Sequence, residues 1–549
     1  MTKLNTDALT KILRTNPRVG STDLCARLGG ISRATLTRAL KGLGATVISG
    51  GGSRRTRYAL RRPLRGNAAP IPLYRIDEHG QGHDLGLLSF IYPEGSCLTN
   101  QDSFPWPLDK DMSDGWFDGL PYPIVDMRPQ GFLGRNFARN HAPDLGVPDN
   151  PDNWSDDDVV HILSLMGYDQ PGDLILGEAA YRRFLDLIRK GDARFLSDAQ
   201  AEKNYPRLAD IAMTQGEAGS SAGGEFPKFT ASRLLNYRKV DVIVKFSGAD
   251  NSPAVRRWAD LLICEHLASA VMANALQVSA AESTLYQYAD RTFLEVVRFD
   301  RHGDFGRSPV CTIGSLNAAL VGGNATWPKT AQAFRDKGWL SDEDVTRVTL
   351  IWWFGRLIAN TDMHEGNLAF HPGLKLAPAY DMLPMMYAPF SGGEVPVKPY
   401  SPALPLPAEA ILWKQSASAA IQFWEACSED RRISPDFRRI CENNSRILAD
   451  FHSQLRYHQN STRISSSRTM NWHASRHGGG MSLFSASSIC CLVSLPASSS
   501  TVFSFSVKCM PIGRLLARMV TRTGQEPHSP FSHSKLIGTL CSLATASRV

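Results

Sequence analysis

Three side chains between residues 360 and 381 could together carry out phosphate chemistry. Asp362 and Asn367 lie five residues apart, and Asp381 follows at the end of a short apolar run. Phosphoryl transfer needs a carboxylate to accept the proton of the attacking hydroxyl group, and two oxygen ligands to hold magnesium against the phosphates. The pattern therefore predicts a catalytic base at Asp362 and magnesium ligands at Asn367 and Asp381.

Elements upstream of these residues would supply the rest of such a site. The segment 219–228 is rich in glycine and serine and ends at Lys228, which indicates a loop able to bring backbone N–H groups close to phosphates. The β-branched run 239–246 indicates a strand that carries Lys245, a side chain suited to contact phosphates. An edge strand over 291–301 and a strongly apolar helix over 341–359 follow, and this helix leads directly into the loop that contains Asp362.

Composition and charge limit the class of protein. Residues 1–66 contain 14 Lys and Arg against 2 Asp and Glu, residues 461–549 contain 9 against 1, and the acidic body between them carries a net charge of −13. We find no secretory start and no apolar run long enough to cross a bilayer, and the cysteines lack the spacing of a zinc site or a disulfide framework. We expect a cytoplasmic protein of several domains that has no membrane partner.

The basic head, residues 1–66, has the pattern of a DNA-binding domain. Helices are predicted over 21–29 and 32–41 with a glycine turn between them, and two short strands flank the basic tip around Gly51, which together resemble a winged helix-turn-helix. Bases would be read by Arg33, Thr35 and Thr37, and phosphates by Arg54, Arg55 and Arg57; Arg38 is a further DNA-binding candidate. The alternative is a small helical interaction domain with a solvated basic face. Residues 61–70 are expected to form a polar linker.

The order of motifs in the acidic body resembles a known family. G-G-E-F-P-K, V-x-R-F-D-R, N-T-D-x-H-x-x-N and A-Y-D-M-x-P occur in this order, as in the HipA-type serine/threonine kinase toxins of bacterial toxin–antitoxin systems. The resemblance covers roughly residues 70–455, and the basic head is similar to the branch with a fused N-terminal helix-turn-helix, the YjjJ type. It implies transfer of the ATP γ-phosphate to Ser or Thr of a protein of the translation machinery, with a HipB-like antitoxin as a partner.

The resemblance also implies roles for individual residues. Asp362 would be the catalytic base, Asn367 and Asp381 would hold Mg²⁺, and Ser221 would be a regulatory autophosphorylation site. The ATP-binding residues would be Gly223, Gly224, Glu225, Phe226, Pro227, Lys228, Lys245, Val297, Arg298, Phe299, His364, Asn367, Tyr380 and Asp381. Two departures from the family pattern are Val297, where Glu is usual at the adenine hinge, and Glu-Phe-Pro before Lys228 in the phosphate loop.

Several of these residues also have purely structural interpretations. Asp381 before Met-Leu-Pro could cap a turn, and His364 could be a structural hydrogen-bond partner. Lys245 could be a surface lysine on a strand, although its apolar neighbours argue against an exposed edge. Ser221 could lie in a Ser/Gly loop without being phosphorylated.

The predicted fold is α+β with four parts. These are a winged helix-turn-helix (1–66), a kinase-like N-terminal lobe (67–300), a mainly helical C-terminal lobe (301–458) and a low-complexity tail (459–549). Beyond position 460 the tail has a single acidic residue, Glu526, and its sequence shows no sustained helical or alternating period. We interpret 461–549 as disordered, outside the fold and translated out of the ancestral reading frame; a functional basic tail is the alternative.

Two other functions compete with the kinase interpretation. The first is a DNA-binding transcriptional regulator whose kinase-like body is inactive or senses a ligand. The second, ranked lower, is a metal-dependent nuclease toxin that uses Asp362 and Asp381, a scheme in which Lys245 has little reason to exist.

Overall fold

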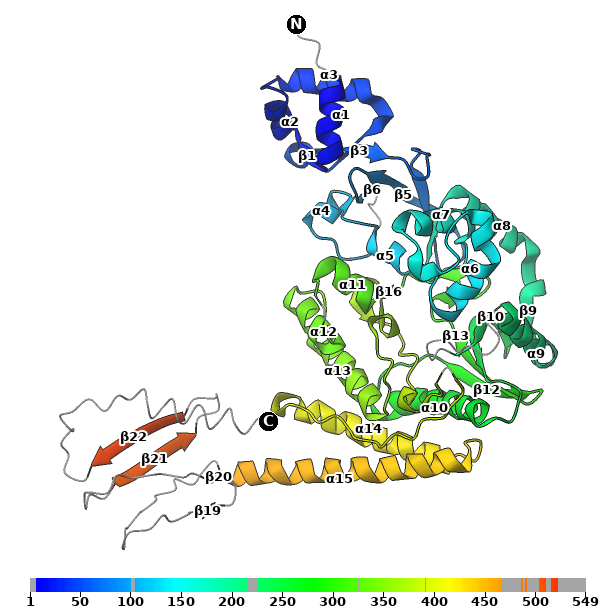
Figure 1. The fold of residues 1–549 in the computed structure, drawn as a ribbon, viewed down its shortest axis with the longest axis vertical. Helices are drawn as coiled ribbons and strands as arrows, with labels where there is room; N and C mark the ends of the chain where they lie inside the picture. Colours follow the sequence, from blue (N-terminus) through cyan, green and yellow to red (C-terminus); the bar gives the residue numbers. More distant parts are fainter. Residues whose placement is uncertain are drawn as a thin grey trace. The chain divides into compact units, whose positions relative to one another are not determined.

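A computed structural model of the chain describes residues 6–99, 104–215, 226–323, 325–390 and 392–465, together with four short strands between 485 and 521 (Figure 1). The chain divides into two compact units, Met1–Ser453 and Gln454–Val549. Four residues of the expected phosphate loop and its phosphorylation site lie outside the described residues: Ser221, Gly223, Gly224 and Glu225.

The basic head consists of helices and short strands around an aliphatic core. Its elements are α1 (Thr6–Thr15), β1 (Val19–Gly20), α2 (Ser21–Arg27), α3 (Arg33–Leu43), β2 (Val47–Gly50) and β3 (Arg57–Arg62). Leu9, Leu13, Leu24 and Leu36 form its core together with Leu60. Helix α3 begins at Ser32, whose hydroxyl oxygen accepts from the Thr35 N–H at 3.2 Å. The helices match those expected over 21–29 and 32–41.

The prediction of a polar linker over 61–70 is wrong for its first residues. Strand β3 pairs with β2 and then continues onto β5 (Gly82–Ile91), because Arg61 and Arg62 lie opposite Ile91 and Phe90. Arg62 also forms a bidentate ion pair with Asp157, with N···O distances of 2.6 and 2.7 Å. The head is therefore joined to the next domain through a continuous sheet.

That sheet continues through the middle of the chain. Its strands lie in the order β1-β3-β5-β4-β8, while β2 pairs with β3, β6 with β5 and β7 with β6. The further strands are β4 (Ile71–Ile76), β6 (Ser96–Thr99), β7 (Trp116–Phe117) and β8 (Leu174–Leu176). The helices of this part are α4 (Lys110–Ser113), α5 (Tyr122–Val125), α6 (Gly131–Leu145), α7 (Asp156–Met166) and α8 (Glu178–Lys190).

A second, five-stranded sheet carries Lys245. Its order is β12-β13-β11-β10-β9, and every pair is antiparallel except β9 with β10. The strands are β9 (Phe195–Leu196), β10 (Lys228–Leu235), β11 (Arg238–Phe246), β12 (Ser283–Tyr288) and β13 (Arg291–Val297). The expected edge strand, β13, is an inner strand because β12 covers its outer side.

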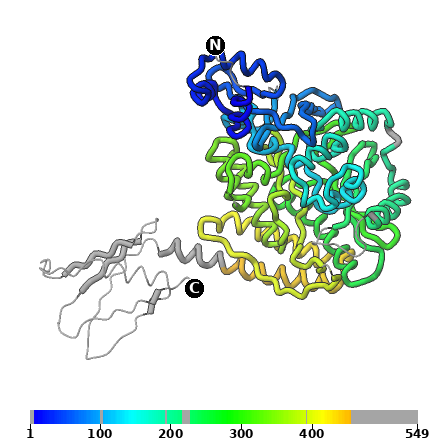
Figure 2. The backbone as a smooth tube through the Cα atoms, turned by 45° about the horizontal axis from the view of Figure 1, so that its top comes forward, coloured from blue at the N-terminus to red at the C-terminus, as the bar shows by residue number. Residues whose placement is uncertain are grey.

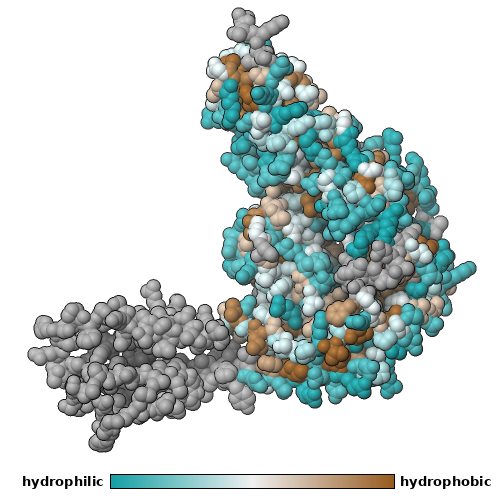
Figure 3. Space-filling model, viewed as in Figure 1, coloured by the Kyte–Doolittle hydropathy of each residue, from teal (hydrophilic) through white to brown (hydrophobic). Residues whose placement is uncertain are grey.

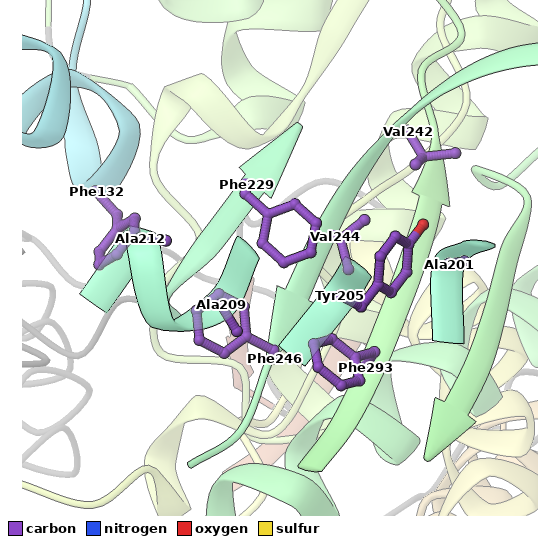
Figure 4. Packing of buried hydrophobic residues seen from close by; sticks show 10 residues of the cluster. All are labelled: Phe132, Ala201, Tyr205, Ala209, Ala212, Phe229, Val242, Val244, Phe246 and Phe293. Carbon is purple, nitrogen blue, oxygen red and sulfur yellow. The ribbon is translucent and has the colours of Figure 1, made fainter. Parts of the chain in front are cut away.

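Helix α9 (Asp198–Gln215) covers one face of this sheet (Figure 4). Val242, Val244 and Phe246 point from β11 into this packed layer, beside Tyr205 of α9. Side chains alternate along a strand, so Lys245 points to the opposite face. There it meets α10 (Pro253–Ala275).

Helices dominate the remainder of the first unit. They are α11 (Ile313–Leu320), α12 (Trp327–Asp336), α13 (Asp342–Leu357), α14 (Ala410–Glu429) and α15 (Pro435–Ser465), and α14 and α15 run side by side in both ribbon and tube views (Figures 1 and 2). Short strands β14 (Arg301–His302), β15 (Gly306–Arg307), β16 (Cys311–Thr312), β17 (Ala369–His371) and β18 (Lys375–Leu376) lie between them in sequence. Helix α13 confirms the apolar helix expected over 341–359.

The surface of the first unit is mostly hydrophilic on the face drawn in Figure 3, with hydrophobic surface where Figure 1 draws α14. No helix among the described residues is both long and apolar enough to cross a membrane. The second unit contains two hairpins, β19 (Ser485–Ala486) with β20 (Ile489–Cys490) and β21 (Phe503–Cys509) with β22 (Leu515–Thr521).

Candidate active site

A buried lysine between two carboxylates forms the centre of the candidate site. Lys245 Nζ donates to Glu265 Oε1 and Oε2 at 2.6 and 2.8 Å, and also to Asp381 Oδ1. Only 7% of the Lys245 side chain and 5% of the Glu265 side chain are exposed. Strand β11, helix α10 and the segment that ends at Asp381 therefore meet at this one ammonium group.

Charge pairing keeps this lysine protonated despite its burial. Burial disfavours the ammonium, but Asp381 and Glu265 outweigh it and raise the pKa of Lys245. For Glu265, burial outweighs the attraction of Lys245, and the pKa of its carboxyl group lies above the ordinary value. A buried pair of this kind holds its geometry firmly, since removing one partner leaves an uncompensated charge.

Asp381 has the properties of a cation ligand. Burial favours its neutral form, but Lys245 and then Lys228 outweigh burial and lower the pKa of the carboxyl group to about 2, so it is ionised at neutral pH. Its backbone has a φ of 57°, in the left-handed region that only a few per cent of non-glycine residues occupy. Such backbone strain is common at functional sites.

Asn360 holds the Asp362 loop and the Asp381 segment together. Its Oδ1 accepts from the Asp362 N–H at 3.0 Å, and its Nδ2 donates to the Asp381 carbonyl at 3.0 Å. Asn360 is 6% exposed and lies three residues after the end of α13 at Leu357. One amide side chain thus fixes the backbones of both predicted catalytic aspartates.

Asn367 is fixed to the same loop. Its Nδ2 donates to the Asp362 carbonyl at 2.8 Å, while Tyr380 Oη donates to the neighbouring Gly366 carbonyl at 2.6 Å. Tyr380 precedes Asp381 and Gly366 precedes Asn367, so this hydrogen bond holds the two predicted metal ligands on adjacent segments. The structure thus brings Asp362, Asn367 and Asp381 to one region.

The donor set suits a magnesium ion that is shared with phosphates. No group of three or more His, Cys, Asp or Glu side chains among the described residues could hold a metal by itself. Mg²⁺ bound beside phosphates needs only one or two protein oxygens, because the phosphates and water supply the others. The ionised Asp381 carboxylate and the amide oxygen of Asn367 meet that requirement.

A cleft of about 550 Å³ opens beside the predicted base. Asp362 is exposed, and Met363 and His364 line the cleft with it. The rest of the wall includes Trp352, Arg356, Met386 and Tyr400. His364 Nδ1 accepts from the Gly366 N–H at 3.0 Å, so the structural interpretation of His364 holds for this ring nitrogen. A hydroxyl group could reach Asp362 from this cleft.

The described end of the phosphate loop lies beside Lys245. Lys228 begins β10 directly opposite Lys245, and the ring of Phe226 lies 6.0 Å from Lys245 Nζ. The Pro227 carbonyl accepts from the Phe246 N–H at 3.1 Å. Lys228 thus adds a second positive charge at the end of the strand where phosphates are expected.

The expected adenine hinge follows β13, but two of its backbone donors are already used. The Val297 N–H donates to the Glu282 carbonyl at 2.8 Å, and the Arg298 N–H donates to the Asp241 carbonyl at 2.9 Å. The Arg298 side chain forms ion pairs with Asp300 and Asp169. The ring of Phe299 lies 5.7 Å from that of Tyr380, which places Phe299 next to the Asp381 segment.

Two residues of the cluster were missed from the sequence. Glu265 is a single carboxylate in the apolar run from Leu261 to Ala268, an unusual residue in a buried helix and hence a detectable signal. Asn360 begins the N-T-D-x-H-x-x-N motif, but the motif alone assigned it no role. Its role depends on contacts with the Asp362 N–H and with the carbonyl of Asp381, which lies 21 residues further along the chain.

The predicted DNA contacts lie on the basic head in two groups. Arg33, Thr37 and Arg38 are exposed on α3, and Thr35 is partly buried beside its cap. Near the tip, Arg54 is exposed, and Arg57 lies on β3. The Arg55 guanidinium pairs instead with Asp114 of the middle region at 3.1 Å, so this side chain is engaged within the protein.

Comparisons with known proteins identify the family of this chain. Residues 67–185 match the family described as the YjjJ-like toxin middle domain, and residues 220–446 match the HipA-like C-terminal domain. Over 438 residues the chain is 36% identical to the toxin YjjJ of Escherichia coli (strain K12). That alignment covers 79% of this chain and 95% of the relative.

Two solved structures are more distant. One is HipA of Shewanella oneidensis MR-1, in a complex of HipA, HipB and operator DNA, with 14% identity, a TM-score of 0.42, and coverage of 70% of this chain and 95% of that chain. The other is the proinflammatory kinase CtkA of Helicobacter pylori, with 12% identity, a TM-score of 0.30, and coverage of 45% and 96%.

Proposed function

The chain belongs to the HipA-type toxin family, and from this premise we propose that it is a serine/threonine protein kinase that uses Mg²⁺ and ATP. The observation that supports the proposal most strongly is the contact of Lys245 with both Glu265 and Asp381. A lysine–glutamate pair between a strand and a helix, with an aspartate beside it, is the arrangement that protein kinases use to hold ATP phosphates and magnesium.

Each residue then has a definite task. Lys245 and Lys228 attract the phosphates, and Glu265 keeps the Lys245 ammonium in place. Asp381 and the amide oxygen of Asn367 would hold Mg²⁺, which supplies charge neutralisation at the transferred phosphate. Asp362 accepts the proton of the Ser or Thr hydroxyl group, which enters from the cleft beside it. Asn360 orients both aspartates.

The remaining contacts with ATP follow from the family resemblance. We assign adenine to the region of Val297, Arg298 and Phe299, and the phosphate loop to residues 223–228, with Ser221 as its regulatory phosphorylation site. The substrate is a protein, by family analogy one of the translation machinery.

A phosphate-transfer assay tests this function. Purified protein is incubated with Mg²⁺, radioactive ATP and a cell lysate, and labelled proteins are identified by mass spectrometry. Asp362→Ala and Asp381→Ala should each reduce labelling at least about 100-fold without changing the melting temperature much. Asp336→Ala, which removes an exposed aspartate on α12, is the matched control and should label normally. Normal labelling by either active-site variant would refute the proposal.

The basic head serves as a DNA-binding winged helix in this proposal. The exposed arginines of α3 and the strong positive charge of residues 1–66 support contact with DNA. A HipB-like antitoxin is the partner that the family resemblance suggests. The rival function, a DNA-binding regulator with an inactive body, predicts DNA binding without any labelled product in the same assay.

A further inference from the structure

A second pocket, of about 370 Å³, is lined by residues of α8 and α9, of the paired strands β10 and β11, and of the segment 298–307. None of Lys245, Glu265 and Asp381 lines it. Its wall carries five arginines and two aspartates, a formal charge of +3, and its arginines are Arg194, Arg207, Arg298, Arg301 and Arg307. So much positive charge at one pocket is unusual, because charged groups that leave water are normally paired.

Aspartates compensate only part of this charge. Arg301 donates to Asp300 Oδ2 and Asp169 Oδ1 at 2.8 and 2.9 Å, and Arg298 pairs with the same two carboxylates. Arg194 donates to Asp241 Oδ1 at 2.9 Å. The nearest carboxylates are therefore shared among three arginines, and Arg307 has none of its own among the ion pairs of the described chain.

Two arginine donors at this pocket are buried without a partner. Arg307 is 3% exposed; its Nη2 donates to the Tyr168 carbonyl, but its Nη1 has no hydrogen-bond partner in the described part of the chain. Nε of Arg194 is likewise buried and unpartnered among the described residues. An unsatisfied buried donor destabilises the folded protein, and more so when the group is charged. A ligand that accepts these hydrogen bonds would remove that penalty.

Electrostatics around Arg307 point to the same kind of ligand. Burial, followed by the neighbouring charge of Arg301, lowers the pKa of the Arg307 guanidinium to about 9, and the attraction of Asp169 does not offset them. The charged form is therefore destabilised in this structure. A bound anion would stabilise it, because opposite charges interact strongly where water is excluded.

We propose that this pocket binds a small phosphate-bearing ligand, a phosphate monoester or a diphosphate, through Arg307 and Arg194. The planar guanidinium group matches phosphate oxygens in pairs, and the exposed Arg207 on α9 would guide the anion into the pocket. Asp241 lies four residues before Lys245 on β11, about 13 Å along the strand. This site is thus separate from the phosphate contacts of the proposed kinase centre.

Calorimetry with pyrophosphate tests the proposal on the full-length chain without Mg²⁺ and at constant ionic strength. Saturable binding is expected, and both Arg307→Lys and Arg207→Glu should weaken it about tenfold or more. Arg307→Lys keeps the charge but loses the paired guanidinium donors, and Arg207→Glu reverses the charge at the pocket. The double variant Lys245→Ala with Glu265→Gln removes the buried lysine of the kinase centre together with its partner charge; it should leave the affinity unchanged, which separates this site from the kinase centre.

Two results would overturn the proposal. One is the absence of saturable binding. The other is binding that is lost in the Lys245→Ala, Glu265→Gln double variant and kept in the arginine variants, because pyrophosphate would then occupy the kinase centre. Arg207 is exposed, so Arg207→Glu decides the question even if Arg307→Lys does not fold.

Discussion

At the residue scale, the charge balance around Lys245 decides both catalysis and stability. Its ammonium group contacts Glu265, which is nearly inaccessible to water, and Asp381, whose side chain is 32% exposed. The two carboxylates therefore respond differently to the loss of Lys245. Asp381 can be solvated, whereas Glu265 cannot.

Lys245→Ala should destabilise the fold by about 3–5 kcal/mol, because it leaves Glu265 buried without its partner. Adding Glu265→Gln to Lys245→Ala removes that charge and should recover a large part of the loss. Urea unfolding of the wild type, the single variant and the double variant measures both effects.

The loss of folding stability in Lys245→Ala should also depend on pH. The pKa of Glu265 is already raised in the folded protein, and losing Lys245 raises it further. A carboxyl group whose pKa is higher in the folded than in the unfolded protein lowers the free energy of unfolding as pH rises from the unfolded-state pKa, about 4.3, through the folded-state pKa. Below about pH 4.3 the group does not change the free energy of unfolding. The single variant should therefore fall increasingly behind the double variant as pH rises above this unfolded-state value. An equal difference at every pH would contradict this account.

Sequence patterns were enough to find the residues whose spacing is local. Asp362 and Asn367 fall within one loop, Asp381 follows after the short strands β17 and β18, and Lys245 lies near the end of a recognisable strand, so all four were predicted and lie in one region. Glu265 was missed because it is 20 residues from its partner, and the pairing depends on how α10 packs against the sheet.

At the element scale, β3 connects the basic head to the rest of the first unit. The pattern of residues 61–70 is polar, which indicated a linker, yet Arg62 and Arg65 are held by Asp157 and Asp158. These partners lie more than 90 residues further along the chain. Local polarity does not distinguish a solvated arginine from one that pairs with a distant carboxylate.

DNA binding by the head should depend on α3. Reversing charge with Arg33→Glu and Arg38→Glu should abolish a gel shift with genomic DNA fragments at low salt, because both side chains are exposed and would contact DNA directly. Asp362→Ala should keep the shift, since it lies far along the chain in the catalytic loop. Equal binding by the double charge reversal would show that α3 does not face DNA.

At the scale of the whole molecule, the match to the HipA-like C-terminal domain ends at residue 446, well before the basic tail. The alignment with the Escherichia coli toxin covers 95% of that relative but only 79% of this chain. The first compact unit ends at Ser453, although α15 runs on to Ser465. Our prediction remains that residues 461–549 lie outside the functional fold.

Deleting residues 466–549 tests this prediction and leaves α15 whole. The truncated protein should keep the melting temperature of the first unit and the full rate of phosphate transfer, because the predicted site lies entirely before residue 382. A lower melting temperature or a slower reaction would favour the alternative, a functional basic tail.

Magnesium-dependent ATP binding by the full chain tests the central claim most directly. Titration calorimetry should detect saturable binding of ATP that is stronger with Mg²⁺ than with EDTA, and Asp381→Ala should remove this magnesium dependence because it deletes the ionised ligand beside Lys245. An affinity that is the same with and without Mg²⁺, or that Asp381→Ala leaves unchanged, would contradict a shared site for nucleotide and metal at this lysine.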